Sequence, residues 1–96
     1  MGNMHFAWDL AKAKANEVKH GVLFEEAQTA FLDDCGRLID DPEHSGAEQR
    51  FILIGYSVKG QCLTVCHCYR REHSEIRLIS ARPATKKEEA TYWSFK

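Results

Sequence analysis

The sequence predicts a small α+β domain in which an antiparallel sheet meander follows two helices and precedes a third. Three strand-like runs, rich in Ile, Val, Leu and aromatic residues, succeed one another at residues 50–58, 61–69 and 75–81. The segments before them have helical periodicity, and a helix-capping sequence comes after them. With 96 residues, of which 44% are hydrophobic and 28% charged, the chain fits one domain over residues 1–96.

The first helix is expected over residues 10–20, after a short strand at residues 5–8. Asp9 is a good N-cap for it, and Gly21 is placed to end it. Beside a narrow apolar stripe, one side of this helix collects polar side chains that carry nitrogen, namely Lys12, Asn16, Lys19 and His20. This stripe is either an ordinary solvated helix edge or a cationic surface.

A second helix is expected from about residue 24. Apolar side chains recur there at helical spacing, at Leu23, Phe24, Ala27, Ala30 and Phe31. A short strand at residues 37–39 and a polar loop at residues 40–49 follow.

A third helix is expected near the C-terminal end. Thr85-Lys86-Lys87-Glu88 has the form of a capping box, in which the Thr and Glu side chains satisfy each other's backbone N–H groups. The helix that it opens carries the aromatic residues Tyr92, Trp93 and Phe95.

The turn between the first two long strands decides which side chains share a face of the sheet. Lys59-Gly60 is expected to form a two-residue hairpin turn. That turn would place Ile52 opposite His67. Arg50 and His67 would then lie on the same face.

The next turn sets the register of the last strand. A four-residue turn at residues 71–74 would place Leu78 opposite His67 and add Arg82 to the face of His67. A slip of one residue would bring in Arg77 instead. Both registers remain open.

The formal net charge of −1 conceals two halves of opposite charge. Residues 1–48 hold 4 Lys and Arg against 10 Asp and Glu, a net charge of −6, and residues 49–96 hold 9 against 4, a net charge of +5. The basic half is able to present a surface to phosphates, although two solvated faces would have the same composition.

Several functions lack the residues that they require. The longest mostly apolar run, residues 51–56, is too short to cross a bilayer, so we expect neither membrane insertion nor secretion. Four Cys without a regular framework are typical of a reduced, cytoplasmic protein. Cys62, Cys66 and Cys68 point in parallel from one strand, so we expect buried thiols and neither metal nor cofactor. Glycine-rich phosphate loops, G-x-S-x-G and H-E-x-x-H are absent from the sequence.

Arg, Lys and His side chains remain as candidates for chemistry, and this set suits metal-free cleavage of RNA. In that reaction a base removes the 2′-OH proton, cations stabilise the phosphorane and an acid protonates the leaving 5′-oxygen. His67 is a candidate for proton transfer or a buried structural residue, and His20 is a site residue or a C-terminal helix cap. Three arginines are able to bind phosphate or to pair with Glu48 or Glu75: Arg50, Arg77 and Arg82.

Several motifs follow one another along nearly the whole chain. The first is Phe6-x-Trp8-Asp9-x-x-Lys12-x-x-x-Asn16-x-x-Lys19-His20-Gly21-Val22-x-Phe24-Glu25-Glu26-Ala27. The others are Asp41-Pro42-Glu43-His44-Ser45, Glu48-x-Arg50-Phe51, Ile54-Gly55, Val65-x-His67 and Ile76-Arg77-x-Ile79-Ser80-Ala81-Arg82-x-Ala84-Thr85-x-x-Glu88. In this order and spacing they resemble the BrnT toxin family.

The resemblance implies the toxin of a bacterial type II toxin–antitoxin pair, a ribonuclease with a small RelE-like fold that halts translation. It implies a BrnA-like ribbon-helix-helix antitoxin as partner, in a complex that is typically a heterotetramer. Operator DNA would be bound only indirectly, through the antitoxin. RNA would be the substrate of the free toxin.

The resemblance also implies the site residues, position by position. Catalysis would fall to His67, Glu48, Arg50 and Arg82, and RNA binding to Lys12, His20 and Arg77. His67 or Glu48 would carry the proton, and Arg50 and Arg82 would hold the scissile phosphate. Lys12 and His20 would contact the flanking backbone.

Two other functions remain open. The first is a toxin-like module without catalysis that binds the antitoxin and supports regulation of its operon, with the terminal aromatic residues as interface anchors. The second is a metal-dependent nuclease, for which only Glu48, Glu72 and Glu75 would supply carboxylates near the sheet.

Overall fold

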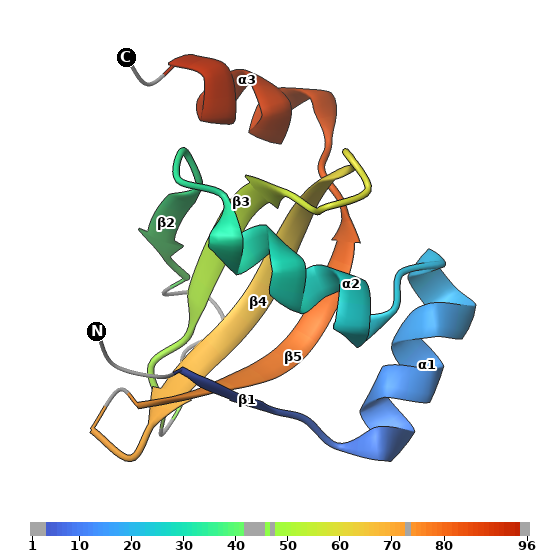
Figure 1. Cartoon of the computed structure of the whole chain (residues 1–96), viewed down its shortest axis with the longest axis vertical. Helices are drawn as coiled ribbons and strands as arrows, with labels where there is room; N and C mark the ends of the chain where they lie inside the picture. Colours follow the sequence, from blue (N-terminus) through green and yellow to red (C-terminus); the bar gives the residue numbers. More distant parts are fainter. Residues whose placement is uncertain (1–3, 42–45, 47, 73, 95–96) are drawn as a thin grey trace.

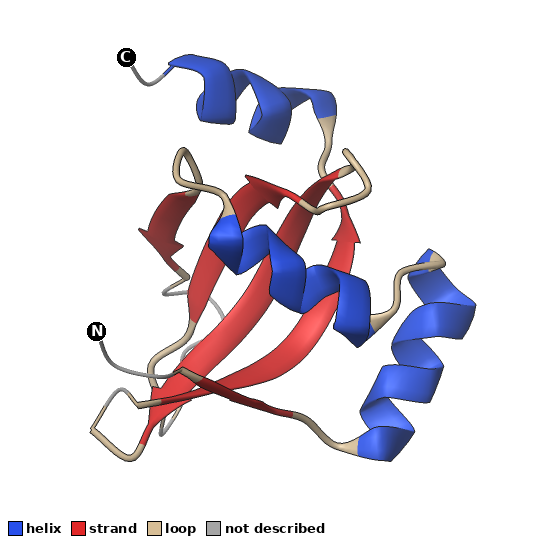
Figure 2. Ribbon diagram, viewed as in Figure 1, coloured by secondary structure: helices blue, strands red, loops and turns tan. Residues whose placement is uncertain are grey.

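The computed structural model describes residues 4–41, 46, 48–72 and 74–94, which form a five-stranded sheet with helices around it (Figures 1 and 2). Its helical segments are α1 (Leu10–His20), α2 (Phe24–Thr29), the 3-10 turn η1 (Ala30–Leu32) and α3 (Lys86–Ser94). Its strands are β1 (His5–Ala7), β2 (Arg37–Asp40), β3 (Phe51–Tyr56), β4 (Cys62–Arg70) and β5 (Glu75–Pro83). The sheet order is β1-β5-β4-β3-β2, and only β1 pairs in parallel, with β5. The predicted α+β class, the meander and the three helices are confirmed.

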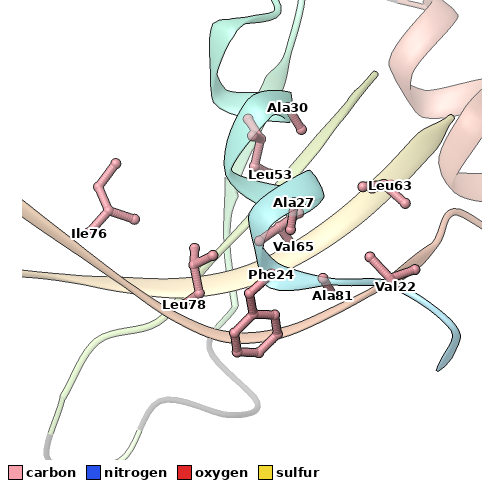
Figure 3. Packing of buried hydrophobic residues seen from close by; sticks show 10 residues of the cluster. All are labelled: Val22, Phe24, Ala27, Ala30, Leu53, Leu63, Val65, Ile76, Leu78 and Ala81. Carbon is pink, nitrogen blue, oxygen red and sulfur yellow. The ribbon is translucent and has the colours of Figure 1, made fainter. Parts of the chain in front are cut away.

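Helix α2 and η1 lie across one face of the sheet, which we call the covered face (Figure 1). Of the five predicted apolar positions of this segment, Phe24, Ala27 and Ala30 are fully buried and Phe31 packs against the core, whereas Leu23 is exposed. They pack against the inward-facing residues of the strands: Leu53, Leu63, Val65, Ile76, Leu78 and Ala81 (Figure 3). Burial of this apolar surface is the main source of the domain's stability.

The turn between β3 and β4 differs from the prediction. Ser57 pairs with Gln61 through Ser57 N and Gln61 O at 2.9 Å, so the loop has three residues, 58–60. Gly60 N donates to Ser57 O at 2.9 Å, and Gly60 has a positive φ of 81°. The turn therefore ends in a left-handed residue, for which glycine is suited. The predicted two-residue turn is therefore wrong.

The longer loop moves the whole hairpin register by one residue. Phe51, and not Ile52, lies opposite His67. Because side chains alternate between the two faces, this shift separates Arg50 from His67. The prediction that they share a face is wrong.

A bulge in β5 decides where the last two arginines point. Leu78 pairs with His67, as predicted, but Cys66 pairs with Ser80, which leaves Ile79 as an extra residue. In a regular strand, residues 77 and 82 would point to opposite faces, since they are five positions apart. The extra residue brings both Arg77 and Arg82 to the face opposite α2, so the prediction that one of them shares the face of His67 is wrong.

Helix α1 is attached to β5 by one buried side chain, Asn16. Its Nδ2 donates to Ala81 O (2.8 Å) and to Val22 O (3.0 Å), while Ala81 N donates to its Oδ1 (3.0 Å). These bonds satisfy the backbone of β5 beyond the end of β1. The polar stripe of α1 is thereby fixed beside the sheet.

Helix α3 closes one end of the face opposite α2. Tyr92 packs against Ile54 and Cys62, and its hydroxyl donates to Asp33 Oδ2 at 2.7 Å. The predicted capping box is present, with Thr85 N donating to Glu88 Oε1 (2.9 Å) and Glu88 N donating to Thr85 Oγ1 (3.1 Å). Phe95 lies outside the described residues, and no described helix is long and apolar enough to span a membrane.

Candidate functional site

The face of the sheet opposite α2 carries three adjoining cavities, and we call this surface the open face. The first, of about 260 Å³, is lined by Asp41, Arg50, Ile52, Thr64, Cys66, Ile79, Ser80 and Arg82. The second, of about 200 Å³, is lined by Lys12, Ala15, Asn16, Lys19, His20, Ile79 and Ser80. The third, of about 220 Å³, is lined by Lys12, Glu48, Arg50, Cys68, Arg70, Arg77, Leu78 and Ile79. The bulge residue Ile79 borders all three, so they form one continuous surface.

Six of the seven predicted site residues line this surface, although they come from distant parts of the sequence. They are Lys12 and His20 of α1, Glu48 and Arg50 of the segment before β3, and Arg77 and Arg82 of β5. The attachment of α1 through Asn16 and the bulge at Ile79 bring them together. Their chemical roles stay a prediction.

His67 is the exception, because it lies on the covered face and is 0% exposed. Its Nδ1 lies 3.1 Å from Val65 O and its Nε2 lies 3.2 Å from the Tyr69 hydroxyl. A carbonyl oxygen only accepts hydrogen bonds, so Nδ1 carries the proton and Nε2 accepts from Tyr69. Burial lowers the pKa of His67, and the ring is packed between Phe31 and Phe51. The geometry fits the structural alternative, a neutral core histidine.

Arg70 is an open-face residue that the sequence reasoning missed. Its Nη2 donates to Glu48 Oε1 at 3.0 Å, and its Nε lies 2.8 Å from Glu48 Oε2. The hydrogen bonds from Arg70 are the main cause that lowers the pKa of Glu48, which is therefore ionised at neutral pH. The sequence contained a signal for this position, because Arg70 alternates with Cys66 and Cys68 along β4 and so shares their face. The observed register places Arg77 on that same face.

Arg82 is engaged by a carboxylate of α3. Its Nη1 and Nη2 donate to Glu88 Oε1 and Oε2, each at 2.8 Å. The hydrogen bonds from Arg82 lower the pKa of Glu88 to about 2. Glu88 was predicted only as a member of the capping box, and its contact with Arg82 is visible only in three dimensions.

Asp41 is a second carboxylate on the open face that the sequence reasoning left in a polar loop. It is 8% exposed and lines the first cavity together with Arg50 and Arg82. Its Oδ2 lies 3.9 Å from Cys66 Sγ, and its backbone N donates to Arg50 O at 3.0 Å. The motif residues 42–45 that follow it lie outside the described residues.

The open face is suited to a polyanion rather than to a metal. Guanidinium and ammonium groups surround the cavities, and the carboxylates Glu48 and Glu88 are held by arginines. Within the described ranges no three His, Cys, Asp or Glu side chains converge as metal ligands would. Arginines can bind a phosphodiester through two hydrogen bonds, and lysines add charge without fixing geometry.

The comparisons with known proteins assign the family. The family described as "Ribonuclease toxin, BrnT, of type II toxin-antitoxin system" matches residues 8–88. The chain belongs to the BrnT family. As a BrnT toxin it is a ribonuclease of a type II toxin–antitoxin system, and such a system implies an antitoxin partner.

A solved BrnT structure shares the fold. The crystal structure of the Brucella abortus ribonuclease toxin BrnT superposes with a TM-score of 0.67 at 21% sequence identity, covering 88% of this chain and 100% of that chain. The predicted BrnT-like, RelE-like α+β fold is confirmed. No curated protein matches the chain.

Proposed function

We propose that this BrnT toxin cleaves RNA on the open face without a metal ion and so inhibits translation in the cytoplasm. The observation that supports the proposal is the convergence of six separately predicted residues on one surface around Ile79. Fixed guanidinium groups stabilise the charge that develops on the phosphorane, which is the role that a metal ion has in other nucleases.

In the proposed mechanism Glu48 accepts the proton of the RNA 2′-OH, because Arg70 keeps its carboxylate ionised. The 2′-oxygen attacks phosphorus and the 5′-oxygen leaves, protonated by solvent or by His20. Arg50 and Arg82 hold the scissile phosphate in the first cavity. Lys12, His20 and Arg77 bind the flanking backbone in the neighbouring cavities.

We assign no catalytic step to His67, although the resemblance implied one. The side chain is buried beneath η1 on the face away from Arg50 and Arg82. Its imidazole would have to cross the sheet to reach a phosphate bound in the first cavity. Proton transfer therefore rests with groups on the open face.

The test is cleavage of an RNA oligonucleotide by wild type in excess EDTA, with analysis of the products. Products with 2′,3′-cyclic phosphate and 5′-OH ends are expected. Arg50→Ala should lower the cleavage rate about 100-fold, the scale of one lost transition-state donor. Arg71→Ala is the control, since Arg71 is exposed in the β4–β5 turn and pairs with Glu75. Equal rates for wild type and Arg50→Ala would overturn the proposed role of the first cavity.

The antitoxin is proposed to be a BrnA-like ribbon-helix-helix protein that forms a heterotetramer with the toxin. In that complex operator DNA is contacted by the antitoxin. Light scattering of the co-purified pair tests the stoichiometry, and a 1:1 complex with one copy of each protein would contradict it.

The ion pairs on the open face favour a second candidate, a toxin-like module that has lost catalysis. Arg70 and Arg82 are already paired with Glu48 and Glu88, and a phosphate has to compete with these carboxylates. Absence of cleavage by wild type, with ribosomes supplied and the antitoxin still bound, would establish this candidate instead.

A further inference from the structure

Glu88 receives more hydrogen bonds than a capping box requires. Besides Thr85 N, its Oε1 accepts from Thr64 Oγ1 (2.9 Å) and from Arg82 Nη1 (2.8 Å), and its Oε2 accepts from Arg82 Nη2 (2.8 Å). Thr64 is on β4 and is 4% exposed, Arg82 is on β5, and Glu88 itself opens α3. One carboxylate therefore joins two strands and a helix at the edge of the first cavity.

The way in which Glu88 holds Arg82 leaves part of the guanidinium available. The carboxylate takes one N–H from each Nη atom, at the end of the group. A guanidinium has five N–H groups, and Nε–H with the second N–H of Nη2 forms a separate edge that matches two phosphate oxygens. In the described part of the chain no other hydrogen bond engages this edge, while Nη1 lies 3.5 Å from Pro83 O. Arg82 is able to bind Glu88 and a phosphate at once.

A free arginine samples many rotamers, and binding a ligand then requires that freedom to be lost. The Arg82 side chain is 37% exposed, so packing against the protein does not by itself fix its position. Thr64 Oγ1, buried in the sheet, and Thr85 N both donate to Glu88 Oε1 and hold the carboxylate in place. Arg82 is thereby oriented before the substrate arrives.

We propose that Glu88 is a positioning residue that orients the guanidinium of Arg82 toward a phosphate in the first cavity. RNA binding then depends on the position of α3 relative to the sheet. This inference rests on the proposed function, in which Arg82 contacts the RNA. Glu88 itself does not contact the substrate.

The experiment measures binding of a non-cleavable 2′-deoxy-substituted RNA oligonucleotide and cleavage of the matching RNA by Glu88→Gln. Gln has the same size, and its oxygen still accepts from Thr85 N, but it cannot pair with both Nη atoms of Arg82. We expect about a tenfold loss in affinity and in kcat/KM. Glu89→Gln, the same change of charge at the next, exposed position, should have little effect.

A double-mutant cycle separates positioning from a general effect on α3. In an Arg82→Ala background, Glu88→Gln should cause no further loss, because the group that it orients is gone. Arg82→Lys leaves the capping box and Thr64 untouched and should lose activity like Glu88→Gln, which keeps the test valid if the latter variant folds poorly.

Two results would overturn the proposal. Tighter RNA binding by Glu88→Gln would show that Glu88 competes with phosphate, and an equal loss in both backgrounds would show a merely structural role. Failure of the proposed function would be seen separately, as absence of RNA cleavage by wild type. In that case the affinity for the non-cleavable oligonucleotide would still test the role of Glu88.

Discussion

The two faces of the sheet are built from alternate residues of the same strands, yet their chemistry is opposite. On the covered face, His67 is packed among aromatic rings, and burial lowers its pKa so that it stays neutral. On the open face, its strand neighbours Cys66 and Cys68 lie among guanidinium groups. A charge on the covered face would have to be desolvated, whereas on the open face it is solvated or paired. Which face a residue occupies therefore decides its role more than its residue type does.

The largest loss of cleavage is expected from deleting Ile79, the bulge residue that borders all three cavities. Without it Arg77 and Arg82 are four positions apart, so a regular strand keeps both on the open face but loses the local bend and twist of the bulge. We expect a folded protein whose cleavage rate falls about 100-fold, because the cationic groups are displaced relative to one another. Ile79→Ala keeps the extra residue and is the control. A deletion variant that folds and cleaves like wild type would show that the bulge is not needed.

The role of the covered face is tested by His67→Ala. Removal of this buried ring should lower the free energy of unfolding by about 3 kcal/mol, since it leaves a cavity and removes the hydrogen bonds between the ring and Val65 O and the Tyr69 hydroxyl. Cleavage by the folded fraction should stay at the wild-type rate. Leu78→Ala, at the paired and equally buried position, is the matched control. A drop in cleavage for the His67 variant alone would restore His67 as a proton carrier.

The ion pair between Arg82 and Glu88 on the open face should make the stability of the protein depend on pH. Glu88 has a folded pKa of about 2, below its ordinary value of 4.5, so the pair contributes stability above about pH 4.5 and loses it as the pH falls toward 2. Glu88→Gln lacks this contribution. The difference in unfolding free energy between wild type and this variant should therefore shrink over that pH range in chemical denaturation. A difference that stays constant would mean that the ion pair does not form.

The smallest effect is expected at the rim of the open face, where Lys12 lines two cavities. Lys12→Ala should weaken binding of single-stranded RNA a few-fold and reduce the slope of log affinity against log salt by about 0.7, the value for one phosphate contact. Lys14→Ala is the control, because Lys14 lies two residues away on α1 and lines the groove toward α2. Equal slopes for both variants would place the RNA elsewhere.

The open face owes its shape to groups that have no role in the proposed reaction. Asn16 holds α1 on β5, and Thr64 supports Glu88, which in turn holds Arg82. Asn16 and Thr64 are both buried polar side chains that form hydrogen bonds with other parts of the protein. The sequence identified Asn16 only as a member of the polar stripe of a helix, and Thr64 only as a residue of a strand.

The elements of this protein follow from local patterns. The bounds of α1, the start of α2, the capping box of α3 and the three long strands all depend on residues close together in the chain, and the sequence predicted them. The family and most of the site residues were likewise recognisable, because their motifs keep their spacing. What the sequence did not decide was the relation between strands.

The tertiary structure decided the register, and with it the membership of the site. One extra residue in the loop before Gln61 and one extra residue at Ile79 each exchange the two faces of a strand, and local propensity scarcely distinguishes these alternatives. Packing distinguishes them, because Leu63, Val65 and Leu78 must meet α2 while the arginines reach solvent. The same requirement puts His67 in the core and leaves Arg77 and Arg82 together on the open face.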